Sequence, residues 1–467
     1  MGIFRFCVAL FSAASCLLAF GHAAWSQAKY AHTGPAIITN VSVIDGLGNQ
    51  PIRGQDVLIE NGKIAAIGLA GSVEAPAGAL KIDGTGMSAM PGLIDMHIHT
   101  LGGWANGTVP GDEFLPKYDD EGKIRRTLLA NLYAGVTTVL DMGASHRWIV
   151  SMRDRVNKDE ILGPRMFVVG APITQKPSGW GGIDPNIIGD YDDIPEYLDA
   201  YQGDGIKIIK LYRGISVQVA RRVIAGAHKR GMKTVADLWS MNLDAIWMKM
   251  TDLDGWAHLG GPHVLPKAVF DMMKQDGRFI VTTAVLGETL AGTRITEDKD
   301  KSFLRNPLVV DIFGRAEIEK YYANTAAGRE YFYDGKDSFY QSQGFGEMTR
   351  YRRNFLANVK QAYDAGVLLA GGTDAPYLGL FWGEGMHREL ELLVEAGIPP
   401  IEAIKICTHN GATVLGVADT IGSLKVGMEA DIVLVKGDPS KNIADTRDIS
   451  HVFKQGKLID RAAIKIQ

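Results

Sequence analysis

The stretch IKIIKLYRGISVQVARRVIAGAHKRGMKTVAD, residues 206–237, contains the unit from which the fold class can be inferred. Residues 206–212 form an apolar run typical of a strand. Residues 216–231 have apolar side chains at helical spacing and end in glycine, which is favoured just beyond the end of a helix. A second strand-like run, residues 232–237, follows. This succession predicts two parallel strands joined by a crossover helix.

The same alternation recurs through residues 91–420 and predicts an α/β fold. Further strand-like runs are GVTTVLDMG (135–143), PRMFVVGA (164–171), GRFIVTTAV (277–285) and VLLAGGTD (367–374). Further helical patterns are IRRTLLANLYAG (124–135), FLANVKQAYDAG (355–366) and HRELELLVEAG (387–397). A closed (β/α)8 TIM-type barrel fits this length and this repetition. A doubly wound sheet is the alternative, but no G-x-G-x-x-G motif follows the first strand of this region.

The flanks of this region have a different pattern. Residues 36–90 and 421–463 contain short runs in which apolar and polar residues alternate, and Asn61-Gly62 is a hairpin signal between two of them. We therefore expect one composite β-sandwich module, built from both flanks, with the barrel of residues 91–420 inserted between them. Within the barrel, residues 288–353 are polar and rich in Tyr and Phe. This stretch is longer than an ordinary connection, so we expect a lid-like insertion or a partner surface.

The composition excludes some classes of function. The chain has 467 residues, of which 46% are hydrophobic and 22% charged, and a formal net charge of −4. This charge argues against a nucleic-acid binder. In residues 1–23, Arg5 is the only charge, and an apolar run leads to the small residues around Ala23. A Sec-type signal peptide and a periplasmic or secreted protein are expected. A membrane anchor is the alternative, but the apolar run is too short to span a bilayer.

Cysteine usage agrees with this reading. The three cysteines are Cys7, Cys16 and Cys407, and the first two would leave with the signal peptide. The remaining cysteine has no partner for an internal disulfide. We expect Cys407 to be a small buried apolar residue, because it lies in the helix-like stretch IKICTHNGA.

His97-Ile98-His99, at the end of the first run of the barrel region, is the strongest chemical signal. Side chains alternate along a strand, so both histidines face the same side and suit a divalent metal. Two surface histidines are the alternative. Asp374 ends the late run VLLAGGTD. A carboxylate there can bind metal and accept a proton from water, although an aspartate before Ala-Pro also suits a turn.

Several stretches, in order, resemble the amidohydrolase superfamily, of the imidazolonepropionase-like and prolidase-like type. They run from about Ile37 to Ile459 and include PGLIDMHIHT (91–100), AGVTTVLDMG (134–143), GPRMFVVGAPIT (163–174), GGTDAP (371–376), MHRELELLVEAGIPPIEAIKICTHNGATVLG (386–416) and GSLKVGMEADIVLVKGDP (422–439). The resemblance implies a (β/α)8 barrel beside a small β module. It also implies one or two divalent metals, usually zinc, at the mouth of the barrel.

The resemblance assigns roles to individual residues. His97 and His99 match the metal ligands of the first strand, and Asp374 matches the last-strand aspartate that is both ligand and proton shuttle. His258, in DGWAHLGG, is similar to the histidine that ends the sixth strand, where it binds metal and polarises the carbonyl. A histidine satisfied within the core is the alternative reading of His258.

The fourth and fifth strands carry the remaining ligands that the resemblance implies. Lys210 matches a lysine that is carbamylated to bridge two metals, and Lys207 is its competitor. Asp237 stands where the family usually has histidine. An aspartate there binds zinc or shifts the preference toward manganese, or else the second site is weakened and the enzyme uses one metal. We interpret His228 as a helix residue that faces away from the metal.

Residues of the substrate pocket are harder to identify. Tyr212 and Arg213 directly follow the lysine strand and could bind a substrate carboxylate, although a solvated loop is an equal alternative. Four tryptophans near predicted strand ends could line an apolar cleft, or belong to the core: Trp180, Trp239, Trp256 and Trp382.

These features predict a metal-dependent hydrolase that cleaves an amide, peptide or cyclic amide C–N bond with metal-activated water and an Asp proton shuttle. A lactonase or phosphoester hydrolase is the first alternative, because a fold does not fix the bond that is cleaved. An exported binding protein with a degraded metal site is the second. We expect a small-molecule or short-peptide substrate, no nucleic acid and no membrane span, and the sequence allows a homo-oligomer.

Overall fold

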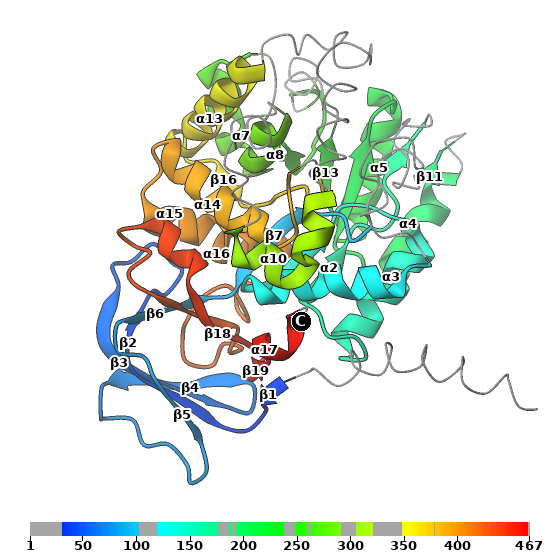
Figure 1. Ribbon diagram of the computed structural model, residues 1–467. Coiled ribbons are helices and arrows are strands. Elements are labelled where there is room, and N and C mark those ends of the chain that lie inside the picture. The colour runs from blue at the N-terminus through cyan, green and yellow to red at the C-terminus, as the bar shows by residue number, and fades with distance from the viewer. Residues whose placement is uncertain are drawn as a thin grey trace, which may run out of the picture.

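The computed structural model describes residues 30–101, 119–175, 186–188, 193–237, 247, 249–259, 263–290, 305–320, 348–377 and 379–465 (Figure 1). The predicted signal peptide, residues 1–23, lies outside the described residues. Among the helices that are described, none has both the length and the apolar character that a membrane crossing requires.

Parallel strands alternate with helices through the central part of the chain, as predicted. A three-stranded sheet has the order β7 (Leu93–Ile98), β8 (Val136–Asp141) and β9 (Arg165–Val168). A seven-stranded sheet has the order β11 (Asn186–Ile187), β10 (Ile173–Thr174), β12 (Ile208–Tyr212), β13 (Lys233–Asp237), β14 (Gly255–Ala257), β15 (Phe279–Val281) and β16 (Leu368–Ala370). All neighbouring strands in both sheets are parallel.

Helices follow most of these strands and cover the sheets (Figure 1). The helix expected within residues 216–231 is α5 (Val217–Lys229). The side chain of Ser216 accepts a hydrogen bond from the backbone N–H of Val219, which satisfies one of the free donors at the start of the helix. The others are α2 (Glu121–Tyr133), α3 (His146–Asn157), α4 (Ile194–Gly203), α7 (Lys267–Gln275), α8 (Ala284–Leu290), α13 (Met348–Asp364), α14 (Glu384–Glu395), α15 (Pro400–Ile406) and α16 (His409–Leu415).

The segment that follows β16 lies directly against β7. The backbone N–H of Met96 donates to the carbonyl oxygen of Gly371 at 2.9 Å, and that of His99 donates to Ala375 at 2.8 Å. This approach depends on glycine at position 372, where a Cβ would lie 3.0 Å from Cβ of His97. The two ends of the β–α succession are therefore in hydrogen-bonded contact.

A nine-stranded sheet forms the β-rich module and combines the two flanks of the chain. Its order is β1 (Tyr30–His32), β19 (Lys457–Ile459), β18 (Ile449–Lys454), β17 (Ile432–Lys436), β6 (Met87–Pro91), β2 (Ala36–Val43), β3 (Ile52–Glu60) and β4 (Lys63–Leu69), and β5 (Leu80–Asp83) pairs with β2. Asn61 and Gly62 both have positive φ between β3 and β4, as the predicted hairpin requires. The single residue Gly92 separates β6 from β7.

The predicted insertion of residues 288–353 is described only at 288–290, 305–320 and 348–353. Its middle part contains α10 (Pro307–Phe313), which begins after Asn306, a residue whose side chain accepts from the N–H of Leu308. Apolar residues of α10 are buried, including Leu308 and Phe313. The expectation of a lid falls on the remainder, which lies outside the described residues. Cys407 is a buried free thiol, as expected.

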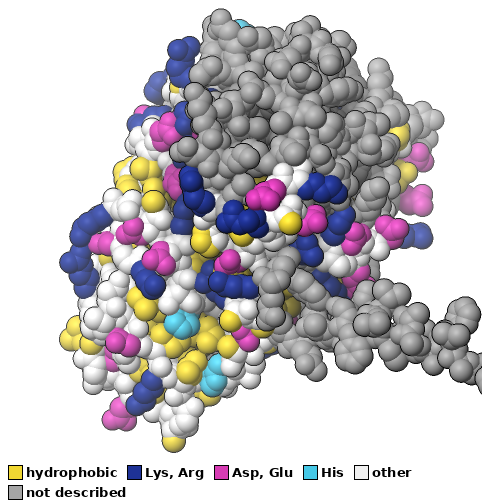
Figure 2. Space-filling model, viewed as in Figure 1, with side chains coloured by type: hydrophobic (Ala, Val, Ile, Leu, Met, Phe, Trp, Pro, Cys, Tyr) yellow, Lys and Arg dark blue, Asp and Glu magenta, His cyan; other side chains and the backbone are white. Residues whose placement is uncertain are grey.

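Figure 2 shows basic and acidic side chains interspersed over the described part of one face of the molecule, not gathered by sign.

Two further elements lie near the end of the chain, the 3₁₀ helix η6 (Ile443–Arg447) and α17 (Arg461–Ile464). Arg447 of η6 contacts Glu384 and Glu391 of α14, at 2.9 and 2.5 Å. These ion pairs connect the β-rich module to the helices of the central part.

Candidate metal centre

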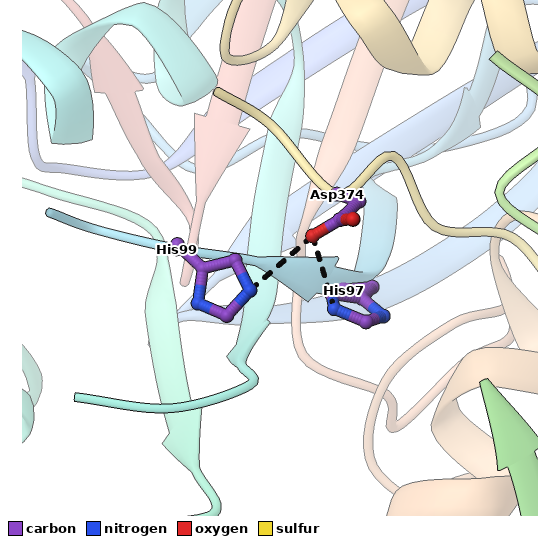
Figure 3. A group of neighbouring side chains, drawn as sticks. All are labelled: His97, His99 and Asp374. Carbon is purple, nitrogen blue, oxygen red and sulfur yellow. Dashed lines mark ion pairs between the residues drawn. The ribbon is translucent and has the colours of Figure 1, made fainter. Parts of the chain in front are cut away.

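The side chains of His97 and His99 converge at the end of β7 with that of Asp374, which follows His99 by 275 positions in the sequence (Figure 3). Nε2 of His97 and Nε2 of His99 each lie 3.2 Å from the same carboxylate oxygen, Oδ1 of Asp374. One ligand atom from each residue lies within 4.8 Å of the others. His97 is fully buried, while His99 and Asp374 keep a small exposed fraction of 13%. The cluster is therefore closed to solvent on the side of His97 and open to solvent at His99 and Asp374.

The ring of His99 is oriented by the loop that follows β8. Its Nδ1 lies 3.2 Å from the carbonyl oxygen of Gly143, and because a carbonyl only accepts, Nδ1 carries the proton. The carboxylate of Asp141 accepts from the N–H of Gly143 at 2.9 Å and from that of Thr100 at 2.7 Å. This arrangement fixes the ring so that Nε2 of His99 faces the cluster, which is the atom that would bind a metal.

The protonation states also suit a metal. Burial lowers the pKa of His97 to about 3, so its imidazole is neutral. Burial alone would raise the pKa of Asp374, but attraction to His97 and hydrogen bonds with His97 and His99 bring this pKa well below its usual value. A neutral imidazole and an ionised carboxylate are the forms that bind metal ions.

A second group of side chains continues from the first. Oδ2 of Asp237, at the end of β13, lies 3.4 Å from Nζ of Lys210 and 3.5 Å from Nε2 of His258. Nε2 of His258 also lies 3.9 Å from Oδ2 of Asp374. Attraction to Lys210 and His258 outweighs burial and lowers the pKa of Asp237. The two oxygens of Asp374 thus face the two groups, and all six predicted ligands form one continuous site.

Some polar atoms of this site have unmet hydrogen-bonding capacity. Among the described residues, Nδ1 of His97, Nζ of Lys210 and Oδ1 of Asp237 are buried without a hydrogen-bond partner. Leaving a buried polar atom without a hydrogen bond costs free energy. The donor set of imidazole nitrogens and carboxylate oxygens is that of zinc and manganese sites. The residues therefore fit a divalent metal centre.

Three neighbouring strands end in strained backbone at this site. His258, Thr283 and Asp374 follow β14, β15 and β16, and their φ angles are 73°, 45° and 65°. Residues other than glycine rarely adopt such angles, and each costs about 1–3 kcal/mol. Nδ1 of His258 lies 2.8 Å from Oγ1 of Thr283, so two of the three strained residues hold each other. Strain of this kind is concentrated at functional sites.

The structure distinguishes Lys210 from Lys207 as the lysine of the candidate site, and it places His228 away from that site. Lys210 lies within β12 and is fully buried, whereas Lys207 precedes the strand and is exposed. His228 lies on α5, and its Nε2 is 2.8 Å from Asp254, outside the ligand cluster. Of the two lysines, only Lys210 contacts the predicted ligands in the described residues.

The predicted substrate residues lie beside Lys210. Tyr212 is buried, and burial together with the charge of Asp237 raises its pKa. The guanidinium of Arg213 lies over the ring of Tyr212, 5.4 Å from the ring centroid. Trp256 and Trp382 are buried, and Nε1 of Trp382 donates to the carbonyl oxygen of His99 at 2.9 Å. Trp180 and Trp239 lie outside the described residues.

Sequence reasoning missed two buried aspartates that support the ligands, Asp95 and Asp141. Asp95 lies on β7 and its carboxylate contacts Thr373, and burial raises the pKa of Asp95 to about 8. Its signal in the sequence was the spacing Asp-x-His-x-His over residues 95–99, which places a carboxylate on the strand face of the histidines. Asp141 ends β8, but its contacts with Thr100 and Gly143 form only in the folded chain, so its sequence position gave no signal.

Two curated relatives match parts of the chain. A deacetylase from Agrobacterium fabrum is 25% identical over 279 residues, which are 59% of this chain and 59% of that protein. An enamidase from Eubacterium barkeri is 30% identical over 112 residues, 24% of this chain and 26% of that protein. The matched segments thus span about three-fifths and one-quarter of these two relatives.

Solved structures are similar over nearly the whole chain. A Xaa-Pro dipeptidase with bound methionine matches with a TM-score of 0.68 and 21% identity, covering 91% of this chain and 99% of that one. Ochratoxinase from A. niger matches with a TM-score of 0.66 and 19% identity, covering 91% and 96%. At these identities the likeness shows the fold alone, an α/β domain with a β-rich module.

The family model described as "Amidohydrolase family" matches residues 88–459. This range includes every predicted ligand, and it extends from β6 past β17, the two strands that pair in the β-rich module. The resemblance seen in the sequence is confirmed, and the chain belongs to the amidohydrolase family.

Proposed function

We propose that this protein is a metal-dependent hydrolase that cleaves an amide, peptide or cyclic amide C–N bond. The observation that carries this proposal is the single carboxylate oxygen of Asp374, which lies 3.2 Å from Nε2 of both His97 and His99. Family membership and the names of the relatives support hydrolysis of C–N bonds.

We further propose that residues 91–420 form a closed (β/α)8 barrel, and that residues 36–90 and 421–463 form its companion module. The hydrogen bonds from β7 to the segment after β16 support closure at that seam, because the first and last strands would meet there. The predicted ligands then lie at the carboxyl ends of the strands, where barrel enzymes carry their sites. Residues 1–23 would act as a signal peptide for export.

The residues of the site would divide the work of hydrolysis. A bound divalent metal would supply a Lewis acid and would lower the pKa of its water ligand to about 7, so that hydroxide forms near neutral pH. Asp374 is ionised, so its carboxylate can accept a proton from water and deliver it to the leaving nitrogen. Nδ1 of His258 is held by Thr283, and its Nε2 points into the site. With a single metal bound, this Nε2 would donate to the carbonyl oxygen of the substrate, whereas in a two-metal site it would be a ligand instead.

The proposed cofactor is zinc, one or two ions, with manganese as an alternative. His97, His99 and Asp374 would hold the first ion, and Asp237 and His258 would hold a second. Unmodified Lys210 attracts Asp237 as a cation. We propose that Lys210 is carbamylated, which would convert this attraction into a cluster of anionic groups that needs a cation.

Metal content is expected to separate one ion from two. Asp237→Ala should lose the second metal, because it removes one of the few ligands of that ion. Lys210→Ala should do the same, whereas Asp237→His should keep two metals and shift the preference toward zinc, which imidazole suits. The measurement is metal per chain in purified protein. Lys207→Ala is the matched control, because this exposed lysine lies outside the cluster. A wild type with one metal that Asp237→Ala leaves unchanged would establish a single-metal site instead.

The substrate is proposed to carry a carboxylate beside the scissile bond, as in a dipeptide or an N-acyl amino acid. Arg213 lies next to Tyr212 close to the ligand cluster, and a guanidinium recognises carboxylates with paired hydrogen bonds. A panel of dipeptides, N-acyl amino acids, lactones and phosphoesters tests this. Hydrolysis of the first two classes is expected, with a KM that rises in Arg213→Met. Turnover of lactones or phosphoesters alone would favour the alternative hydrolase, and protein that purifies without metal would favour a binding protein.

A further inference from the structure

Asp95 and Thr373 form a buried bridge between β7 and the segment after β16. Oδ1 of Asp95 accepts from the N–H of His97 at 3.1 Å and from the N–H of Thr373 at 3.0 Å. Oδ2 of Asp95 accepts from the hydroxyl of Thr373 at 2.7 Å. Both residues are fully buried. The carboxylate of Asp95 is therefore hydrogen-bonded both to the backbone of the ligand His97 and to Thr373, the residue that precedes the ligand Asp374.

The same bridge also fixes the backbone of the residues before and after Asp374. The hydroxyl of Thr373 accepts from the N–H of Ala375 at 3.1 Å. The N–H of Asp374 itself donates to the carbonyl oxygen of His97 at 2.6 Å. Each residue of the stretch 373–375 is thus fixed by a hydrogen bond, and the residue at its centre has a φ of 65°. Nothing in an aspartate side chain requires this conformation, so its neighbours must hold it.

We infer that Asp95 and Thr373 are positioning residues that hold Asp374 in its left-handed conformation and thereby place its carboxylate between His97 and His99. Neither side chain reaches the ligand atoms; they act through the backbone. This inference rests on the proposed function, because it assumes that the three ligands bind a divalent metal.

A carboxylate elsewhere in the chain provides a matched control. Asp56, in β3 of the β-rich module, is buried, and it accepts from the N–H of Asn40 at 3.0 Å and from that of Gly71 at 2.7 Å. Asn40 also has a positive φ, of 52°. Asp56 therefore performs the same backbone task away from the metal centre. Asp56→Asn should therefore show how much stability is lost when a carboxylate of this kind is removed without disturbing the metal centre.

The test measures cobalt binding to the full-length apoprotein, prepared with a chelator. Thr373→Val removes the hydroxyl and keeps the shape, and it should weaken cobalt affinity about 10- to 100-fold, as expected when a supporting partner of a ligand is lost. Its cobalt absorption spectrum should change, because Asp374 would no longer be held in place. Thr373→Ser restores the hydroxyl and should restore both readouts. Asp95→Asn keeps one acceptor oxygen and should give a smaller loss than Thr373→Val.

The outcomes separate this inference from the proposed function. Circular dichroism and Tm establish that each variant is folded, and Asp56→Asn should lower Tm while it binds cobalt like wild type. Folded Thr373→Val with wild-type affinity and spectrum overturns the inference alone. So does a loss of affinity that Thr373→Ser fails to restore. If Thr373→Val does not fold, Asp95→Asn decides, and wild-type binding in that variant rejects the inference. Wild-type protein that takes up no cobalt rejects the proposed function as well.

Discussion

His97→Ala is expected to weaken zinc binding by more than about 100-fold, beyond the 10- to 100-fold range that is typical when only a supporting partner of a ligand is lost. The imidazole is fully buried and contributes one of the two nitrogens that lie 3.2 Å from Oδ1 of Asp374. Without it, the carboxylate keeps only His99 on that side. Turnover should fall at least as steeply, because the proposed reaction depends on the metal. The measurements are zinc per chain after dialysis, zinc affinity by competition with a chelating dye, and kcat/KM.

His228→Ala serves as the control for this substitution. His228 is also a histidine that contacts a carboxylate, that of Asp254, but it lies on α5 away from the cluster. This variant should keep zinc affinity and kcat/KM close to wild type. Circular dichroism must show that His97→Ala is folded. A folded His97→Ala protein with stoichiometric zinc and normal turnover would disprove the metal assignment.

Asp374→Asn should lower kcat by about 100- to 10,000-fold, the range that general acid–base catalysis contributes. Asparagine preserves the shape and one acceptor oxygen, so part of the metal affinity should survive. It cannot accept a proton from water or deliver one to the leaving nitrogen. The two effects are separable, because kcat is measured at saturating metal, where weakened binding no longer limits the rate.

The control for Asp374→Asn is another aspartate that pairs with histidine. Oδ2 of Asp204 lies 2.7 Å from Nε2 of His146, and this pair lies at the surface, where Asp204 is 42% exposed. Asp204→Asn should leave kcat nearly unchanged. An Asp374→Asn enzyme that retains wild-type kcat when fully loaded with metal would show that another group carries the proton.

The sequence predicted the α/β character well because it depends on local pattern. Apolar runs and helical spacing recur often enough that α5 and its two flanking strands lie where residues 206–237 predicted them. The family assignment followed from motifs in a fixed order and is confirmed by the match over residues 88–459. Closure of the barrel is a long-range property, and no local pattern encodes it.

The candidate site was predictable where spacing alone decides the outcome. His97 and His99 share a strand face because side chains alternate. Spacing left Lys207 in competition with Lys210, and the structure separates them because Lys207 precedes β12 and is exposed. The bridge from Asp95 to Thr373 could not be predicted, because the two residues are 278 positions apart and meet only where the segment after β16 lies against β7. The left-handed backbone of Asp374 was equally hidden, since nothing in its residue type demands it.

The pairing of β6 with β17 has a consequence for the order in which the molecule can be assembled. β6 leads through a single residue into β7, the strand of both histidines, yet its antiparallel partner is synthesised about 340 residues later. Until that partner emerges from the ribosome, one edge of β6 has unpaired backbone groups, and such edges invite association between chains. The sheet of the β-rich module is therefore completed only when both flanks of the chain are present, unlike successive domains of a nascent chain, which fold one after another.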